Sequence, residues 1–149
     1  RVQRCTKHKL ENLLAKAPRH AQAELRRDYQ AIIGAEDLQA AQKAYRAFVA
    51  KWSLLAKEVV RSLEEAGEEL LTFYAFPPSQ WKCLRTTNPI EAVNSAFKRR
   101  TRSQGAFTTE DSALVLLWGL FANDQIRLKR IDGWKELAAV SWPGLRRAA

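Results

Sequence analysis

The amino-acid sequence predicts a mainly α-helical fold. From residue 9 onward, apolar side chains recur at the helical spacing i, i+3, i+4 and i+7, beginning with Leu10, Leu13 and Leu14. Helix-ending residues interrupt this pattern, with Pro18 after the first run and Gly34 after the second. The chain has 149 residues, of which 46% are hydrophobic, so it is long enough to bury one core. We therefore expect a helical bundle over most of the first half of the chain.

One strand and four helices are expected in that half. The opening residues alternate polar and apolar side chains, which is typical of a short edge strand. Asp37 can cap the third helix, and Gly67 lies where the helical propensity breaks. The expected elements are a strand over residues 1–6 and helices over residues 9–17, 21–33, 38–66 and 68–74.

Three further helices are expected in the second half. Asn88 can cap the first, with Pro89 at position N1 and Glu91 at N3, from which a carboxylate can reach back to the backbone N–H of the cap. The second has a start signal at Thr108, and its first half is apolar nearly all round, so we expect it to be buried. The last precedes a basic tail that we expect to fray. These helices are expected over residues 89–102, 112–130 and 134–140.

The net charge of +9 is distributed unevenly. Lys and Arg outnumber Asp and Glu by eight to three over residues 1–30, by five to one over residues 85–102 and by six to two over residues 127–149. Residues 31–84 are close to neutral, with six basic and seven acidic side chains. This pattern favours a polyanionic partner such as DNA, because each phosphate that Lys or Arg neutralises releases counterions. Basic helix faces that are only solvated would give the same count, so both interpretations stay open.

The composition argues against a membrane protein. No apolar run approaches the roughly 20 residues that a membrane helix needs, and the first residues lack the apolar region of a signal peptide. We expect a cytoplasmic location and no membrane partner. Met is absent, which predicts a fragment or a processed product.

Cys5 and His8 form a C-x-x-H motif of uncertain role. Such spacing can start a zinc site, but zinc usually takes four ligands, and only Cys83 and His20 remain as further soft ligands. The alternative is a half-buried thiol and a histidine in a strand-to-helix turn. A disulfide between the two cysteines is not expected in a reducing compartment.

The segment around Glu91 carries the strongest candidate chemistry. On a helix with about 100° per residue, Glu91 and Lys98 lie within about 20° of each other and about 10 Å apart along the axis, with Asn94 between them. Ile90, Val93 and Phe97 are expected to form the packed stripe. A carboxylate can bind Mg²⁺, and a lysine two turns further can hold a phosphate. On spacing alone the alternative that Glu91 is only a capping residue is favoured, since it is expected at the capping-box position and acids are favoured near helix N-termini.

The same segment resembles the C-terminal signature of Mutator-like transposases of bacterial insertion sequences. The resemblance rests on Arg85-Thr86-Thr87-Asn88-Pro89-Ile90-Glu91, Asn94, Lys98-Arg99-Arg100-Thr101-Arg102, Gly105, Phe107 and Ser112-Ala113-Leu114. The opening Gln3-Arg4-Cys5-Thr6-Lys7-His8-Lys9-Leu10 with Asn12 is similar to the segment that follows the second catalytic aspartate of that family, and Phe73-Tyr74, Phe76-Pro77 and Trp81-Lys82 fit a third block more loosely. The resemblance therefore covers most of the chain and is least specific in its helical middle.

The resemblance implies a split ribonuclease-H-like catalytic domain of the DDE type. Residues 1–8 would be its last strand, residues 9–78 a helical insertion and residues 79–149 the C-terminal helical part of the core. Glu91 would be the catalytic glutamate and a ligand of Mg²⁺ or Mn²⁺. The partners would be DNA, at element ends and at the target, and further copies of the protein in a homo-oligomer. The expected DNA-binding residues are Arg85, Asn94, Lys98, Arg99, Arg100 and Arg102.

Two departures from the family pattern matter. The residue after the glutamate is usually Arg in the family and is Ala92 here. The two catalytic aspartates are expected upstream of the sequence, because none of its own aspartates lies in a matching context. These are Asp28, Asp37, Asp111, Asp124 and Asp132. The chain alone is therefore expected to be inactive, and a non-catalytic helical module for DNA binding or dimerisation remains the alternative.

Overall fold

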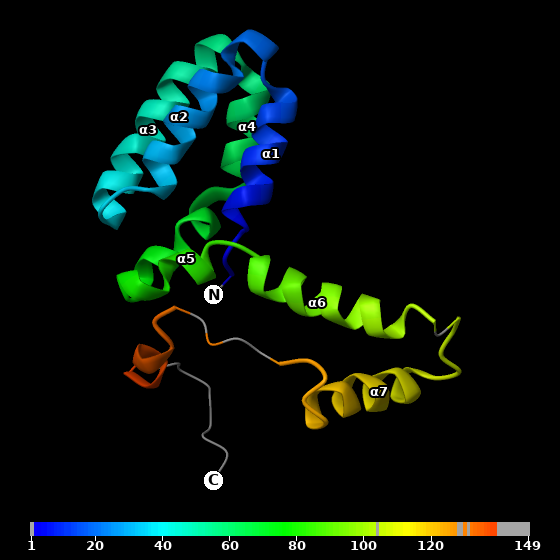
Figure 1. Cartoon of the computed structure of the whole chain (residues 1–149). Coiled ribbons are helices and arrows are strands. Elements are labelled where there is room, and N and C mark those ends of the chain that lie inside the picture. The colour runs from blue at the N-terminus through cyan, green and yellow to red at the C-terminus, as the bar shows by residue number, and fades with distance from the viewer. Residues whose placement is uncertain (1, 104, 128–129, 131, 140–149) are drawn as a thin grey trace. The chain divides into compact units, whose positions relative to one another are not determined.

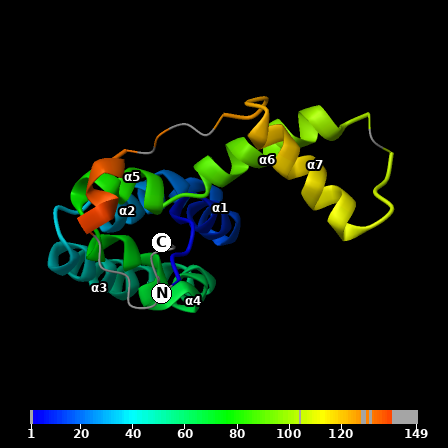
Figure 2. The same ribbon diagram turned by 90° about the horizontal axis from the view of Figure 1, so that it is seen from below.

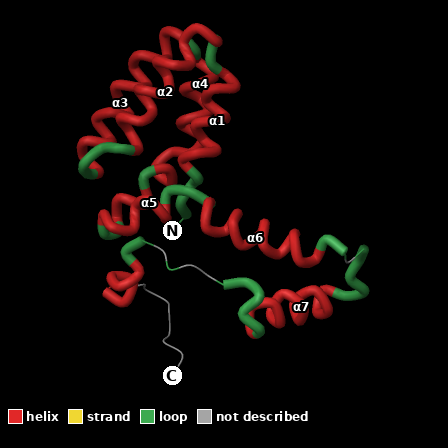
Figure 3. Tube along the Cα trace, in the orientation of Figure 1, coloured by secondary structure: helices red, strands yellow, loops and turns green. Residues whose placement is uncertain are grey.

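The computed structural model of the chain describes residues 2–103, 105–127, 130 and 132–139. Every regular element within these residues is a helix (Figure 3), which confirms the mainly α-helical prediction. The chain forms two compact units. The bundle unit comprises Arg1–Thr86 and Asp132–Ala149, and the hairpin unit comprises Thr87–Ile131. No helix in the described ranges is both long and apolar enough to cross a lipid bilayer.

Four helices form the body of the bundle unit. Helix α2 packs against α3, α3 against α4, α4 against α1 and α1 against α2, so the four close into a ring around one core (Figures 1 and 2). Their bounds are α1 (Thr6–Lys16), α2 (Gln22–Ile33), α3 (Leu38–Leu55) and α4 (Lys57–Ala66). The shorter elements are the 3-10 turns η1 (Arg19–Ala21), η2 (Gly67–Leu70), η3 (Thr72–Ala75), η4 (Pro78–Gln80) and η5 (Trp134–Ala139), and the one-turn helix α5 (Trp81–Leu84).

The ends of these helices largely follow the expected signals. The Asp37 carboxylate accepts a hydrogen bond from the backbone N–H of Ala40 at 2.7 Å and so caps α3 as predicted. Gly34 closes α2 and Gly67, at φ 50°, ends α4. The single helix expected over residues 38–66 is two helices, because the backbone leaves the helical conformation at Ala56 (φ −157°). Ala56 is neither Gly nor Pro, so no sequence signal marked this break.

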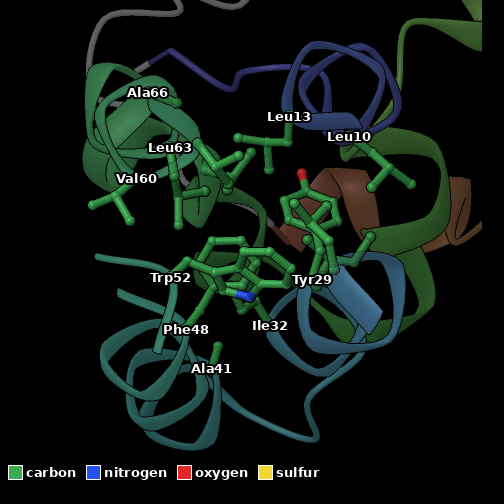
Figure 4. Close-up of a cluster of buried hydrophobic side chains, with 14 of the residues drawn as sticks. Leu10, Leu13, Tyr29, Ile32, Ala41, Phe48, Trp52, Val60, Leu63 and Ala66 are labelled. Atoms are coloured by element: carbon green, nitrogen blue, oxygen red, sulfur yellow. The ribbon is translucent and has the colours of Figure 1, made fainter. Parts of the chain in front are cut away.

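Large apolar side chains from all four helices fill the core of the bundle unit (Figure 4). Trp52, Tyr29 and Phe48 are at most 2% exposed. The polar side-chain atoms of Tyr29 and Trp52 both form hydrogen bonds. The Tyr29 hydroxyl donates to the Thr6 carbonyl at 2.9 Å, and the Trp52 indole donates to the Asp28 carboxylate at 3.0 Å. Burial, with a smaller contribution from Cys5, raises the pKa of the Tyr29 hydroxyl well above its usual range. The helical bundle expected from the periodicity is therefore present with the expected stripes as its core.

The N-terminal strand does not form within the described residues. Residues 2–5 have no regular structure, and α1 already begins at Thr6, so residues 6–8 are helical. A strand needs a neighbouring strand for its ladder. Here the extended segment follows η2 and η3: the Arg4 N–H donates to the Glu69 carbonyl at 3.0 Å, and Gln3 bonds backbone groups of Leu70 and Phe73. The wider division at residues 8 and 78 stays a prediction.

The hairpin unit consists of α6 (Asn88–Thr101) and α7 (Glu110–Ala122), which lie side by side in Figures 1 and 2. Phe97 of α6 and Phe121 of α7 join them edge to face, with ring centroids 5.2 Å apart at an interplanar angle of 89°. The Thr109 hydroxyl accepts from the Ser112 N–H at 3.1 Å, and the Ser112 hydroxyl accepts from the Thr109 N–H at 3.3 Å. This reciprocal cap starts α7 one residue after the predicted signal.

The predicted burial of α7 is wrong for the described chain. Leu114, Val115 and Trp118 are 56%, 70% and 72% exposed, and Leu120 is the buried residue of this helix. The prediction failed because an apolar sequence indicates only that a helix prefers an apolar environment. It does not indicate whether another element packs over that helix. The helix also ends at Ala122 rather than near residue 130, because Asp124 adopts a positive φ of 53°.

The chain returns to the bundle unit at residues 132–133. Gly133 lies against η4, where the Gln80 amide donates to its carbonyl at 3.3 Å, and Lys82 forms an ion pair with Asp132 at 3.7 Å. The helix expected over residues 134–140 is the 3-10 turn η5 as far as Ala139. Val140 and the basic tail lie outside the described residues.

Candidate functional site

Helix α6 carries Glu91 in its first turns. The helix begins at Asn88, with Thr87 as its N-cap and Pro89 at N2, and the Glu91 N–H donates to the Thr87 carbonyl at 2.9 Å. The predicted start is therefore one residue late, since we expected Asn88 to be the cap. Glu91 falls at N4, and Ile90 occupies the N3 position of a capping box. Glu91 therefore does not lie at the capping-box position, although it remains in the first turn, where an acid is favoured by the helix dipole.

The Glu91 carboxylate accepts a hydrogen bond from a neighbouring side chain. The Thr87 hydroxyl donates to Glu91 Oε1 at 2.6 Å, within the range of short, charge-assisted O–H···O⁻ bonds. Glu91 is half-buried, whereas Asn94 is exposed. Thr87 was not among the site residues predicted from the sequence. The sequence signal that could have indicated Thr87 is its position four residues before Glu91. Side chains four residues apart are neighbours on the same face of a helix.

The basic residues of the site cluster at the end of α6. Lys98, Arg99, Arg100 and Arg102 are all exposed. None of these four side chains forms an ion pair within the described residues, and Arg100 makes only a 3.4 Å contact with the carbonyl of Ala96. Cations in the last turn favour the helix through its dipole. They also present positive charge at the end of the helix opposite to the predicted carboxylate.

The packed stripe on α6 forms only in part. Val93 and Phe97 are half-buried, but Ile90 is 64% exposed. Since α6 is continuous from Asn88 to Thr101, Glu91 and Lys98 have the predicted relation of about 20° and about 10 Å along the axis. The structure therefore places Glu91, Asn94, Lys98, Arg99 and Arg100 on one helix, with Arg102 at its C-cap.

Arg85 belongs to the bundle unit. Its guanidinium donates to the Ile33 carbonyl at the end of α2 at 2.9 Å, and it is half-buried. The Arg85 carbonyl accepts from both the N–H and the hydroxyl of Thr6, at 2.9 and 2.8 Å. These bonds tie the segment before α6 to α1 and α2. They give Arg85 a structural role, and its contact with DNA stays a prediction.

The C-x-x-H motif does not form part of a metal cluster in the described residues. Cys5 is the half-buried N-cap of α1, and His8 is exposed one turn later. No group of three or more His, Cys, Asp or Glu side chains suited to a metal ion occurs in the described part of the chain. Neither Cys5 nor Cys83 forms a disulfide within the described residues. Burial raises the pKa of the Cys83 thiol, which donates to the Gln80 carbonyl at 3.0 Å.

Two of the aspartates that we excluded from catalysis have structural partners. Asp28 accepts from Lys51 at 2.6 Å and from the Trp52 indole, and Asp37 caps α3. A hollow of about 480 Å³ on the bundle unit is likewise unconnected with the predicted residues. Its lining includes Leu38, Glu68 and Leu71. The candidate site therefore consists of residues of α6 and its two caps.

Glu91 fits a hard divalent cation as a single ligand. A carboxylate oxygen is the donor that Mg²⁺ prefers, and Mn²⁺ is suited to the same ligands. A pair of ions for phosphoryl transfer needs further carboxylates, and the described residues supply no such group around Glu91. The chemistry that α6 can offer alone is one metal ligand beside a phosphate-binding surface.

Comparison with known proteins decides the family. A family profile described as "Transposase, Mutator family" matches residues 1–130, which include parts of both units. The chain belongs to the Mutator family of transposases. This confirms the resemblance that the motif around Glu91 indicated.

Individual relatives agree with the profile. The chain is 36% identical over 119 residues to the transposase for insertion sequence element IS905 of Lactococcus lactis, covering 80% of this chain and 30% of that protein. It is 38% identical over 99 residues to the transposase for IST2 of Acidithiobacillus ferrooxidans, covering 66% and 33%. It is 37% identical over 100 residues to the transposase for IS6120 of Mycolicibacterium smegmatis, covering 67% and 31%. The matched segment of this chain thus spans about a third of the length of these relatives.

Proposed function

We propose that this chain is the C-terminal portion of a DNA transposase that cuts element ends and joins them to target DNA by metal-dependent DDE chemistry. In this proposal Glu91 is the third carboxylate of a ribonuclease-H-like active site, and two aspartates come from a part of the protein outside this sequence. The observation that carries it is the family match over residues 1–130, which includes the motif around Glu91. The share of the relatives that the chain covers supports the idea of an incomplete site.

In this proposal the residues of α6 and its C-cap have different roles. Glu91 would hold Mg²⁺ or Mn²⁺ through a carboxylate oxygen. Such ions stabilise the attacking and leaving oxygens when a phosphodiester is cleaved. Lys98, Arg99, Arg100 and Arg102 would bind backbone phosphates, which positions the DNA without reading its sequence. Asn94, exposed on the same helix, can donate a further hydrogen bond to the DNA. The transposase would bind DNA in a bacterial cytoplasm. Copies of the transposase would also bind one another in a homo-oligomer.

The test of catalysis is cleavage of element-end DNA by the full-length transposase in Mn²⁺. Glu91→Gln keeps the shape of the side chain and removes its charge, so we expect cleavage to fall by at least about 10³-fold, a loss comparable to that of other charged catalytic groups. Glu110→Gln, the same change at an exposed acid on α7, should cut like wild type. The 149-residue chain alone should not cut.

Binding is measured separately. Glu91→Gln should bind DNA at least as well as wild type, because it removes a negative charge. If Glu91→Gln cuts like wild type, the catalytic assignment is wrong. DNA binding by that variant would then favour the non-catalytic helical module.

The test of the DNA surface uses the chain itself. For Lys98→Gln, the slope of log K against log salt should become shallower by about 0.9, the value for one lost phosphate contact on duplex DNA. Lys57→Gln removes an exposed lysine at the start of α4 and serves as the control with an unchanged slope. Equal slopes for the wild type, Lys98→Gln and Lys57→Gln would exclude Lys98 as a phosphate ligand.

A further inference from the structure

Two threonines cap the two helices of the hairpin unit, and they use their hydroxyls differently. Thr109 at the start of α7 accepts from the N3 backbone N–H, as N-cap threonines usually do. Thr87 at the start of α6 makes no side-chain capping hydrogen bond. Its hydroxyl donates instead to Glu91 Oε1 at 2.6 Å. A side-chain capping bond stabilises a helix by about 1 kcal/mol. Helix α6 lacks this bond at Thr87, the residue whose hydroxyl contacts the Glu91 carboxylate.

The geometry of this contact defines what it can do. Thr87 is β-branched and has few side-chain rotamers, so its hydroxyl is held in place. The Glu91 N–H also donates to the Thr87 carbonyl at 2.9 Å, which fixes the two residues to each other through the backbone. A glutamate side chain otherwise rotates about three bonds. The short bond therefore favours one orientation of the half-buried carboxylate.

We propose that Thr87 is a positioning residue that orients the Glu91 carboxylate for binding a divalent cation. This proposal rests on the assignment of Glu91 as a metal ligand. Carboxylates that bind metals are commonly held by hydrogen bonds from neighbouring groups, and loss of such a bond typically costs about 10- to 100-fold in metal affinity or activity. The role belongs to the donated proton, so Ser can replace Thr at this position and Val cannot.

The experiment measures DNA cleavage by the full-length transposase as a function of Mn²⁺ concentration. Thr87→Val keeps the shape of the side chain and removes the donor. We expect it to raise the Mn²⁺ concentration for half-maximal cleavage, or to lower the maximal rate, by about 10- to 100-fold. Thr87→Ser should stay close to wild type. DNA binding without a divalent cation should be equal for the three proteins, since Thr87 is not part of the phosphate-binding surface.

Thr101→Val is the matched control. Thr101 is half-buried on the same helix, and its hydroxyl donates to the Phe97 carbonyl at 3.0 Å rather than to an acid. The same chemical change there should leave the Mn²⁺ dependence at its wild-type value. Helix content of the 149-residue chain, measured by circular dichroism, checks that each variant is folded.

Thr87→Asp covers the case in which Val weakens the helix. Asp is among the best N-cap residues but, when ionised, has no proton to donate and repels the Glu91 carboxylate. It should preserve α6 and show a metal defect at least as large as that of Thr87→Val. Wild-type Mn²⁺ dependence in either a folded Thr87→Val or a folded Thr87→Asp protein would overturn the proposal. So would a Thr87→Ser protein as defective as Thr87→Val.

The outcomes separate this proposal from the proposed function. If Glu91→Gln abolishes cleavage and Thr87→Val has no effect, Glu91 keeps its role and the role of Thr87 is wrong. If Glu91→Gln cuts like wild type, the catalytic assignment fails and the positioning role fails with it.

Discussion

The bundle unit and the hairpin unit are both helical, but they differ in how their apolar side chains are used. In the bundle unit, Trp52, Tyr29 and Phe48 lie in a common core and are almost fully buried. In the hairpin unit, Trp118 and Val115 are more than two thirds exposed, and one aromatic pair joins the two helices. The comparison teaches that the bundle unit is stabilised by its own core, whereas the hairpin unit, which carries Glu91, has little core within the described residues.

Replacing one tryptophan in each unit by alanine should give the largest difference between the units in the free energy of unfolding. Trp52→Ala removes a fully buried indole and leaves Asp28 without one of its donors, so it should lower the free energy of unfolding by about 3–5 kcal/mol. Trp118→Ala removes a side chain that is 72% exposed and should change it by no more than about 0.5 kcal/mol. Urea denaturation followed by far-ultraviolet circular dichroism measures both. Equal losses would contradict the distinction between the units.

A glycine in each unit gives the next contrast, with opposite signs. Gly133 has φ 70°, and a Cβ there would lie 2.5 Å from Ser79 Oγ and 3.0 Å from the Ser79 carbonyl carbon. Gly133→Ala should therefore cost about 1–3 kcal/mol through strain and displaced backbone. Gly119 lies within α7, and apart from its chain neighbours and the nearby backbone of α7 itself, a Cβ there would meet no atom within 4 Å. Gly119→Ala should increase helix content, because Ala is better than Gly in a helix by about 1 kcal/mol. Thermal unfolding followed at 222 nm tests both, and a stabilised Gly133→Ala protein would refute the described packing of Gly133.

Features that depend on local chemistry were predictable from the sequence. The caps and stops at Asp37, Gly34 and Gly67 and the position of α6 follow from side chains that act on their own backbone. The family motif then led to Glu91, which the periodicity alone could not distinguish from a cap. The shift of the cap to Thr87 was beyond this reasoning, because Thr87 and Asn88 are adjacent and both are good N-cap residues.

Features that depend on the surroundings of an element were not predictable in the same way. The break at Ala56 has no local signal and serves to bring α4 back against α1 and α3. The burial of α7 was predicted from composition, although exposure depends on what lies beside the helix. The expected strand at the N-terminus likewise depended on a partner strand, which the described residues do not contain. In each case the sequence indicates a preference, and the neighbouring elements decide the outcome.

Removing a helix cap in each unit should give a smaller effect. Asp37→Ala removes the bond to the Ala40 N–H and should lower the free energy of unfolding by about 1 kcal/mol, because α3 is part of the cooperative core. Thr109→Ala removes the cap of α7 and should reduce helix content at 222 nm while leaving the urea midpoint unchanged. A midpoint that shifts equally in both variants would show that the two units unfold together.

The smallest effect on stability is expected on the exposed face of α7, where a charge should change surface properties alone. Val115 is 70% exposed and lies beside Leu114 and Trp118, so together they form a contiguous apolar face that can bind an apolar dye. Val115→Glu should lower the fluorescence of bound anilinonaphthalene sulfonate and leave the urea midpoint within about 0.5 kcal/mol of wild type. Leu54→Glu, at a residue that is 88% exposed on the bundle unit, is the matched control and should reduce dye binding less. If Val115→Glu instead unfolds the chain, α7 contributes to a core, and the contrast between the two units is wrong.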